Sequence, residues 1–176
     1  GGKKYFQALD AAISAEPRQP VLVCGASGGG KSALLANWAQ SYASAHPEAI
    51  MLTHFLATGA DAAHPVNMAI RLLREISRIT GEEFVLEGDP RKAIRLLEPW
   101  LEKAGVFARE KGGVFILVLD ALDKMTEHRD LDWWPRRLPE GVALVASCLD
   151  GGIRDSVLPK MEWRELRVSS LKRADC

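Results

Sequence analysis

A glycine-rich segment near the start of the chain carries the residues best suited to chemistry. Its sequence, Gly25-Ala26-Ser27-Gly28-Gly29-Gly30-Lys31-Ser32, satisfies the pattern G-x-x-x-x-G-K-[ST], which is typical of phosphate-binding loops. Glycines let the backbone curl so that successive amide groups point at phosphate oxygens, and a helix that follows adds the positive end of its dipole. Lys31 would bridge the β- and γ-phosphates, and the Ser32 hydroxyl would ligate Mg²⁺. The alternative is a flexible glycine turn with a chance Lys-Ser pair.

We therefore predict that this loop binds ATP or ADP together with Mg²⁺. The predicted nucleotide-binding residues on the loop are Gly25, Ala26, Ser27, Gly28, Gly29, Gly30, Lys31, Ser32 and Ala33. Lys31 is also a predicted catalytic residue, because a cation at this place stabilises the charge that develops on a transferred phosphoryl group. Ser32 is a predicted metal ligand.

Two aspartates farther along the chain are placed to complete a magnesium site. Asp120 directly follows an apolar run, at the carboxyl end of the expected sheet, and we predict that it holds the metal. Asp123 would orient or deprotonate the attacking water, unless it caps the next helix instead. Ser147 is a candidate γ-phosphate sensor if its strand lies between the loop strand and the Asp120 strand. A hydroxyl that satisfies a loop backbone is an equal alternative for Ser147.

Short apolar runs alternate with longer amphipathic ones, as βα units require when helices cover both faces of a parallel sheet. Strands are expected at residues 21–24, 50–55, 114–119, 142–146 and 165–168. No internal repeat or low-complexity segment interrupts the pattern. The predicted fold class is α/β, a three-layer P-loop NTPase sandwich with a mainly parallel five-stranded sheet and helices on both faces.

Helices are expected at residues 5–14 and 32–45. Pro17 and Pro20 stand between the first helix and the first strand, and Pro47 follows the second helix. A loop through Gly59, Asp61 and Pro65 should lead into a helix that ends near Gly81. The apolar face of that helix is expected to comprise Val66, Ile70, Leu73 and Ile76. Another helical stretch opens at Pro90, and Pro99 inside it predicts a kink or a break.

The bulk composition is that of one ordinary domain. The 176 residues are 47% hydrophobic, and 23 basic residues balance 23 acidic ones. Because no block of like charge stands out, neither nucleic acid nor a membrane is a predicted partner. The three dispersed cysteines, Cys24, Cys148 and Cys176, and the lack of a secretion signal indicate the cytoplasm. Residues 1–176 are expected to be one domain excised from a longer chain, with Gly1 and Gly2 as a candidate expression remnant.

The glycine-rich loop, the two aspartates and Ser147 together resemble the NACHT family of STAND NTPases, in the branch that contains nephrocystin and telomerase-associated protein. The segment 20–38 looks like the P-loop and first helix of that branch, and His54-Phe55-Leu56 is similar to its second strand and the residues that follow. Asp120-Ala121-Leu122-Asp123 looks like its Walker B element. Trp134-Pro135 and Leu138-Pro139 resemble the approach to its sensor strand.

The resemblance implies an ATP-driven switch in a multidomain signalling protein. Such a switch cycles between an ADP-bound resting form and an ATP-bound form that oligomerises, so its partners would be adjacent domains of the parent chain and further copies of itself. Two positions depart from the family pattern. Lys124 stands where members often carry another acidic residue, and Ser147-Cys148-Leu149 contains no arginine. Slow hydrolysis is therefore expected.

Three other functions are weighed against this one. A GTPase lacks support, because the chain contains neither Asn-Lys-x-Asp nor Asp-x-x-Gly. A small-molecule kinase would use Arg154, near Gly151 and Gly152, to cover the phosphate donor. A non-catalytic module would bind nucleotide only to set its shape and self-association.

Overall fold

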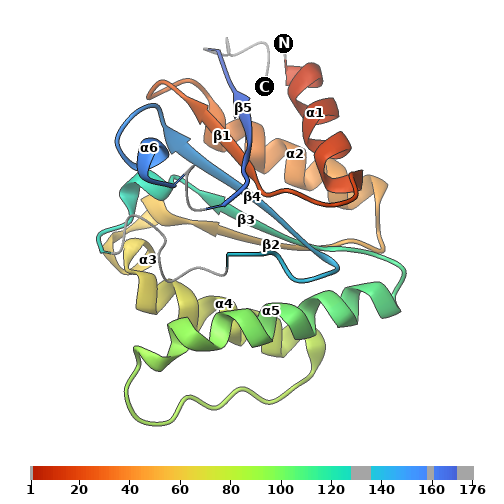
Figure 1. The fold of residues 1–176 in the computed structure, drawn as a ribbon, viewed down its shortest axis with the longest axis vertical. Helices are drawn as coiled ribbons and strands as arrows, with labels where there is room; N and C mark the ends of the chain where they lie inside the picture. Colours follow the sequence, from red (N-terminus) through yellow and green to blue (C-terminus); the bar gives the residue numbers. More distant parts are fainter. Residues whose placement is uncertain (1, 128–135, 158–160, 170–176) are drawn as a thin grey trace.

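The computed structural model describes residues 2–127, 136–157 and 161–169 (Figure 1). In chain order the elements are α1 (Gly2–Ser14), β1 (Val21–Gly25), α2 (Lys31–Ala45), β2 (Ile50–Phe55), η1 (Leu56–Thr58), α3 (Ala60–Ala63), α4 (Pro65–Thr80), α5 (Lys92–Glu110), β3 (Phe115–Asp120), η2 (Leu122–Lys124), β4 (Val142–Leu149), α6 (Ile153–Val157) and β5 (Arg164–Arg167). Within these ranges, no helix is both long enough and apolar enough to cross a membrane.

Five parallel strands form one sheet in the order β2-β3-β4-β1-β5. This arrangement confirms the predicted five-stranded parallel sheet of an α/β fold. β4 lies between β1 and β3, with Val145 opposite both Val21 and Val118. Because parallel strands point the same way, Gly25, Asp120 and Leu149 end their strands at one edge of the sheet. In open α/β sheets this carboxyl edge is where ligands bind.

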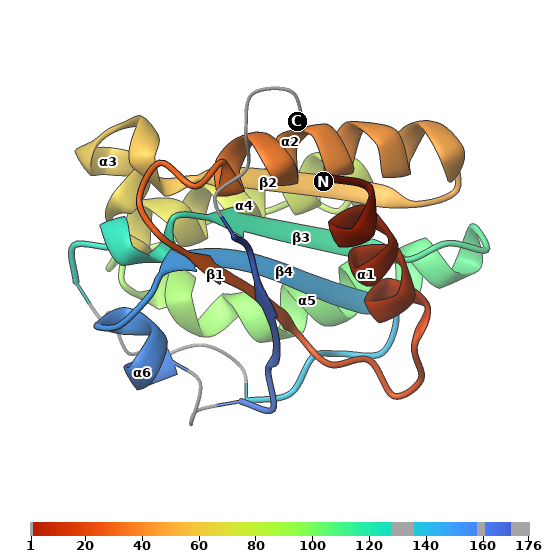
Figure 2. The same cartoon turned by 90° about the horizontal axis from the view of Figure 1, so that it is seen from above.

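Apolar side chains form a separate cluster on each face of the sheet. Along β1, Leu22 and Cys24 join the cluster with the buried sides of α4 and α5, whereas Val21 and Val23 join the cluster with α1 and α2. Figures 1 and 2 show these two helix pairs on opposite faces, so the molecule is the three-layer sandwich that was predicted. Every residue of β1 and β3 is buried, which explains why these strands are apolar at successive positions.

Three details differ from the sequence expectations. The segment after β2, expected as a loop, contains η1 and the short helix α3. On α4 the buried residues are Pro65, Met68, Ala69, Leu72, Leu73 and Ile76. The buried face is therefore turned away from Val66 and Ile70, which are half-buried. α5 continues through Pro99 without a break. Pro99 is exposed, so water can replace the helix hydrogen bond that proline cannot donate.

The contact between α5 and the start of β4 depends on two glycines. A Cβ atom at Gly105 would lie 2.2 Å from the Glu140 carbonyl oxygen, and one at Gly141 would lie 2.5 Å from the Gly105 carbonyl oxygen. Gly141 also has a φ of 81°, in the left-handed region that glycine enters without steric cost. The helix can lie directly against this backbone only because both positions lack side chains.

We expect Gly105→Ala to destabilise the protein. In most helix interiors the same change would stabilise, because alanine is more favourable there than glycine by about 1 kcal/mol. The added methyl group must displace the Glu140 backbone, so the free energy of unfolding in urea should show a net fall of about 1–2 kcal/mol. Val106→Ala, at a 45% exposed position of the same helix, is the matched control and should change it by less than about 0.5 kcal/mol. A more stable Gly105→Ala protein would contradict the close contact.

Ion pairs connect the edge strand β5 to α6. The Arg154 guanidinium of α6 donates hydrogen bonds of 2.9 and 2.7 Å to the two carboxylate oxygens of Glu165 in β5. Arg167 also lies 2.9 Å from this carboxylate. The hydrogen bonds from Arg154 hold the pKa of Glu165 below its ordinary value, and the carboxylate in turn raises the pKa of Arg154. The pair thus fixes α6 to the last strand of the sheet.

The Glu165 ion pair predicts a pH dependence of stability. The pKa of Glu165 is lower in the folded chain than in the unfolded chain, so its carboxylate stabilises the fold above the unfolded pKa. That contribution is lost as the pH falls through the folded pKa. Between about pH 7 and pH 3, the free energy of unfolding should therefore fall less in Glu165→Gln than in the unsubstituted chain. Glu102→Gln, on the exposed side of α5, should keep the parent pH dependence. Identical curves for all three proteins would rule out this contribution.

Candidate functional site

The glycine-rich loop connects β1 to α2 at the carboxyl edge of the sheet. β1 ends at Gly25 and α2 begins at Lys31, which is the strand-to-helix context that the motif requires. Gly28 and Gly30 have φ values of 71° and 84°, which curl the chain, and the Gly29 amide donates to the Ala26 carbonyl at 3.1 Å. Ala26, Ser27, Gly28, Ser32 and Ala33 are exposed on the loop and the first turn of α2. The amino end of a long helix thus opens at an exposed turn, where an anion is favoured.

Lys31 lies inside the curl of the loop. Its side chain is almost fully buried, and its ammonium group donates to the carbonyl oxygens of Gly25 and Ala26 at 2.9 and 2.8 Å. A buried ammonium needs such acceptors, because transfer of an unpaired charge from water is costly. The predicted loop residues are therefore arranged around a fixed positive charge, and their binding of phosphate stays a prediction.

Gly25 is required for a reason that the loop motif does not reveal. A Cβ atom there would lie 2.5 Å from the carbonyl oxygen of Val168, in the segment that follows β5. The amide of Val168 donates to the Cys24 carbonyl at 2.8 Å, so this backbone is held against the start of the loop. The position of the loop is thus tied to the edge strand of the sheet.

Asp120 and Ser147 form a buried pair on the neighbouring strands β3 and β4. The Ser147 hydroxyl donates to Asp120 Oδ1 at 2.5 Å and accepts the Ala121 amide at 2.9 Å. The two side chains are 2% and 0% exposed. Ala121 has a φ of 62°, an unusual left-handed conformation for a residue with a Cβ atom, and the bond from its amide holds this turn. Ser147 therefore does satisfy a loop backbone, as one interpretation predicted, and its role as a phosphate sensor stays a prediction.

Asp123 lies in the turn η2, just after β3. Its Oδ1 atom accepts the backbone amide of Leu149 at 3.1 Å, and its Oδ2 atom is 3.9 Å from the Lys124 ammonium. The N-cap of η2 is Ala121, so the alternative that Asp123 caps the next helix is wrong for the described part of the chain. The carboxylate instead fastens η2 to the end of β4. With 15% of its side chain exposed, it retains limited access to solvent.

The strand register brings these groups to one place. Gly25 pairs with Leu149, and Ser147 of the same strand reaches Asp120. One edge of the sheet, formed by the carboxyl ends of β1, β4 and β3, therefore holds the loop residues together with Asp120, Asp123 and Ser147. Such an arrangement offers amides and a cation to an anion, and hard oxygen donors to a divalent metal ion. Trp134 and Pro135, from the resemblance, lie outside the described residues.

Two contacts near this edge were not predicted from the sequence. Cys24 and Cys148 lie on β1 and β4 with their Sγ atoms 3.6 Å apart. This hydrogen bond and burial raise the pKa of the Cys148 thiol, and the same bond lowers that of Cys24. The second contact is the ion pair between Arg154 and Glu165. A kinase would use Arg154 to cover the phosphate donor, but here this arginine is held in a structural ion pair.

His54 is buried, and both of its ring nitrogens are hydrogen-bonded, one to the Ala62 carbonyl and the other to Arg71. These contacts are those of a structural histidine.

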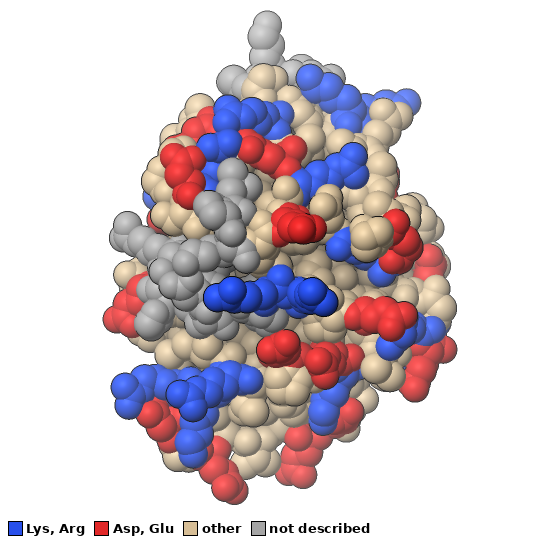
Figure 3. Space-filling model, viewed as in Figure 1, with Lys and Arg blue, Asp and Glu red and all other residues tan. Residues whose placement is uncertain are grey.

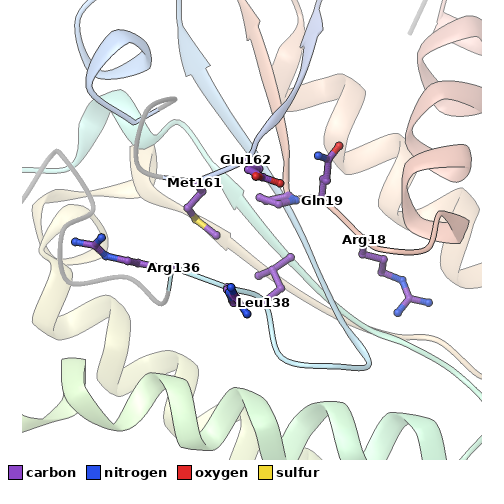
Figure 4. A pocket seen from close by; sticks show the side chains of 8 residues that line it. Arg18, Gln19, Arg136, Leu138, Met161 and Glu162 are labelled. Atoms are coloured by element: carbon purple, nitrogen blue, oxygen red, sulfur yellow. The ribbon is translucent and has the colours of Figure 1, made fainter.

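One hollow beside these strands lies at their opposite ends. A pocket of about 500 Å³ is formed by the segments that lead into β1, β4 and β5, and it includes Arg18, Arg136 and Met161. Figure 4 shows Arg18 and Arg136 pointing to opposite sides of it. Figure 3 shows basic and acidic residues interspersed over the face seen in Figure 1. The lining of this pocket includes Arg18, Arg136, Arg137 and Glu162, but it lies away from the glycine motif at the carboxyl edge of the sheet. The glycine-rich loop is the better candidate.

Comparison with known proteins shows where similar chains occur. No protein-family model matches this chain. Nephrocystin-3 of Homo sapiens is 31% identical over 150 residues, which cover 84% of this chain and 11% of that protein. The ORC1 protein of Aeropyrum pernix, solved in complex with DNA, has a TM-score of 0.61 at 16% identity, over 99% of this chain and 45% of its own. The Walker-type ATPase PABY2304 of Pyrococcus abyssi has the same score and identity, over 99% and 55% of the two chains.

The likeness to solved structures establishes the fold. This chain has the α/β fold of P-loop ATPases, with the glycine-rich loop after the first strand. The chain spans about a tenth of the length of nephrocystin-3. The activity and partners of that whole protein are therefore not transferred with the fold.

Ser147→Ala tests the buried pair. The substitution leaves the Ala121 amide without its acceptor and Asp120 without a donor, so we expect the free energy of unfolding to fall by about 1–3 kcal/mol. Ser156→Ala, at an exposed position of α6, is the control and should change it by less than about 0.5 kcal/mol. Urea unfolding of the two variants makes the comparison. Equal stability would show that the hydroxyl is dispensable for this turn.

Proposed function

We propose that this chain is a nucleotide-binding switch domain that binds Mg-ATP and Mg-ADP and hydrolyses ATP slowly. The observation that carries the proposal is the loop Gly25–Ser32, curled around the buried Lys31 ammonium at the sheet edge where Asp120 and Ser147 meet. Loop amides and Lys31 would hold the β- and γ-phosphates. Ser147 would sense the γ-phosphate if its hydroxyl, which donates to Asp120 in this structure, turned its proton to a phosphate oxygen.

The donor set near the loop fits Mg²⁺. Ser32 presents an exposed hydroxyl in the first turn of α2, and Asp120 supplies a carboxylate that Ser147 orients. Magnesium prefers oxygen ligands and usually keeps several waters, so one hydroxyl, phosphate oxygens and waters held by Asp120 suit it. When bound, the ion would neutralise charge on the phosphates. Asp123 would orient the attacking water, although its bond to Leu149 limits how far its carboxylate can turn.

A proposed family membership leads to the switch part of the proposal. We propose that the chain belongs to the NACHT family of STAND NTPases, which is supported by the motif residues that resemble it and by the 31% identity with nephrocystin-3. The chain would then act in the cytoplasm as one domain of a longer signalling protein. Its partners would be adjacent domains of that protein and, in the ATP-bound form, further copies of itself. Neither nucleic acid nor a membrane is proposed as a direct partner.

A second candidate function is a non-catalytic module that binds nucleotide to control shape and self-association. One observation favours it. The Asp123 carboxylate is bonded to the Leu149 amide and lies 3.9 Å from the Lys124 ammonium, so it is restrained from turning toward a water molecule. Binding of nucleotide without turnover would support this module over the ATPase.

Lys31→Ala tests nucleotide binding directly. Loss of the ammonium removes the cation at the phosphates, so the affinity for fluorescent mant-ADP in the presence of Mg²⁺ should fall on the order of a hundredfold. Lys124→Ala, which removes an exposed lysine from η2, is the matched control and should bind as the parent chain does. Calorimetry with Mg-ATP and Mg-ADP provides a label-free check. If the parent chain produces no heat of binding, the proposal is wrong.

Asp123→Asn separates the two candidate functions. If Asp123 orients the attacking water, single-turnover hydrolysis of ATP should slow by on the order of 10²-fold while the affinity for ATP changes little. Asn keeps an oxygen that can accept the Leu149 amide, so the turn η2 should be retained. Equal single-turnover rates for parent and variant would remove Asp123 from the mechanism.

A further inference from the structure

Two cysteines that are distant in the chain meet beside the candidate site. Cys24 and Cys148 are register partners on the neighbouring parallel strands β1 and β4, and their Sγ atoms are 3.6 Å apart. Their side chains are 0% and 1% exposed. A disulfide needs an S–S distance of about 2.0 Å, so closure requires the sulfur atoms to approach by only about 1.5 Å. The two cysteines are thus paired in register with their sulfur atoms in contact.

Both thiols are attached to backbone that holds the candidate site. Cys24 is followed by Gly25, whose carbonyl accepts the Lys31 ammonium. Cys148 lies between Ser147, which contacts Asp120, and Leu149, whose amide donates to Asp123. A Cβ atom at Gly25 would already collide with Val168, so the start of the loop has little room to adjust. Any backbone displacement that accompanies S–S closure would therefore act on the loop and on both carboxylates.

We propose that Cys24 and Cys148 are a redox modification site, in which a hydroperoxide converts the two thiols into an intramolecular disulfide that weakens nucleotide binding. Formation of the disulfide does not require the proposed nucleotide function. Its effect on nucleotide rests on the function proposed above.

The chemistry balances with one hydroperoxide molecule. The Cys24 sulfur loses its proton and attacks the peroxide, so an S–O bond forms, the O–O bond breaks, and one water leaves when hydrogen peroxide is the oxidant. The Cys148 sulfur then attacks this sulfenic acid, the S–S bond forms, and the hydroxyl group leaves as a second water with the proton of Cys148. Each sulfur loses one electron overall, and the peroxide gains two.

Local opening at α6 would give the oxidant a route to the buried thiols. α6 contributes Ile153 and Val157 to the apolar cluster that also contains both thiols. Figures 1 and 2 place this short helix beside the carboxyl end of β4. Its described tie to β5 is the ion pair between Arg154 and Glu165, near the surface. A five-residue surface helix of this kind can open at lower free energy than the whole domain.

Counting free thiols tests the disulfide. A chain with Cys176→Ser, which removes the third thiol, is treated with hydrogen peroxide, denatured and alkylated, and its intact mass is measured. We expect the reduced chain to take two labels and the oxidised monomer to take none, with full recovery of both labels after dithiothreitol. Two retained labels, sulfinic acid at either cysteine, or a linked dimer in place of the monomer would overturn the proposal.

Cys24→Ala and Cys148→Ala, each combined with Cys176→Ser, are the matched controls. Each has one remaining buried thiol, so neither can form the intramolecular bond. Their affinity for mant-ADP should not respond to the disulfide-forming peroxide treatment, and thermal unfolding before treatment checks that they are folded. The label count on the chain that keeps both cysteines decides the first part of the proposal even if one control fails to fold.

Mant-ADP binding tests the coupling. The oxidised monomer should bind on the order of tenfold more weakly than the reduced one, because small displacements of positioning groups are costly, and dithiothreitol should restore the affinity. Unchanged affinity in a monomer shown to contain the disulfide would overturn the coupling. If the reduced chain binds no mant-ADP at all, the proposed nucleotide function fails, whereas the label count still decides whether the thiols form a disulfide.

Discussion

The place of β4 between β1 and β3 is the constraint on which the candidate site depends. Each strand has at most two neighbours in a sheet. The two neighbours of β4 are β1, which leads into the glycine-rich loop, and β3, which ends at Asp120. Ser147 pairs in register with Val23 on one side and bonds Asp120 on the other. If β4 lay at an edge of the sheet, it could pair with only one of these two strands. The strand order therefore decides which side chains meet.

Burial of polar groups makes this arrangement specific. Among the described residues, the buried polar side chains are Lys31, His54, Asp120 and Ser147, and each takes part in a hydrogen bond. A buried polar group without a partner costs about 1–3 kcal/mol, so the sheet edge is stable only in conformations that keep these bonds. Charges in such surroundings also interact more strongly than in water. The groups that would contact a polyphosphate are thus held by hydrogen bonds, which they need because they are buried away from water.

The same edge contains features that would restrain catalysis. Asp123 is fastened to the end of β4, and Lys124 lies beside it. The left-handed Ala121 turn places Asp123 where it can be fastened in this way. A domain with these restraints would suit the proposed switch better than a fast enzyme, because hydrolysis in a switch serves to reset the bound state. The two buried thiols lie within the same set of contacts, so redox chemistry there would act on the geometry of the loop.

Local pattern was enough to predict the strands, the α/β class and the loop from Gly25 to Ser32, because apolar runs and glycine spacing act over a few residues. It did not reveal that α5 continues through Pro99 or which face of α4 is buried, since both depend on what lies against the helix. The sequence by itself determined that a glycine-rich loop with the pattern of phosphate-binding loops follows the first strand. Only the tertiary structure decided that Ser147 bonds Asp120 and that Cys24 meets Cys148. These contacts cross between strands that are distant in the chain, and hydrogen bonding across the sheet selects them.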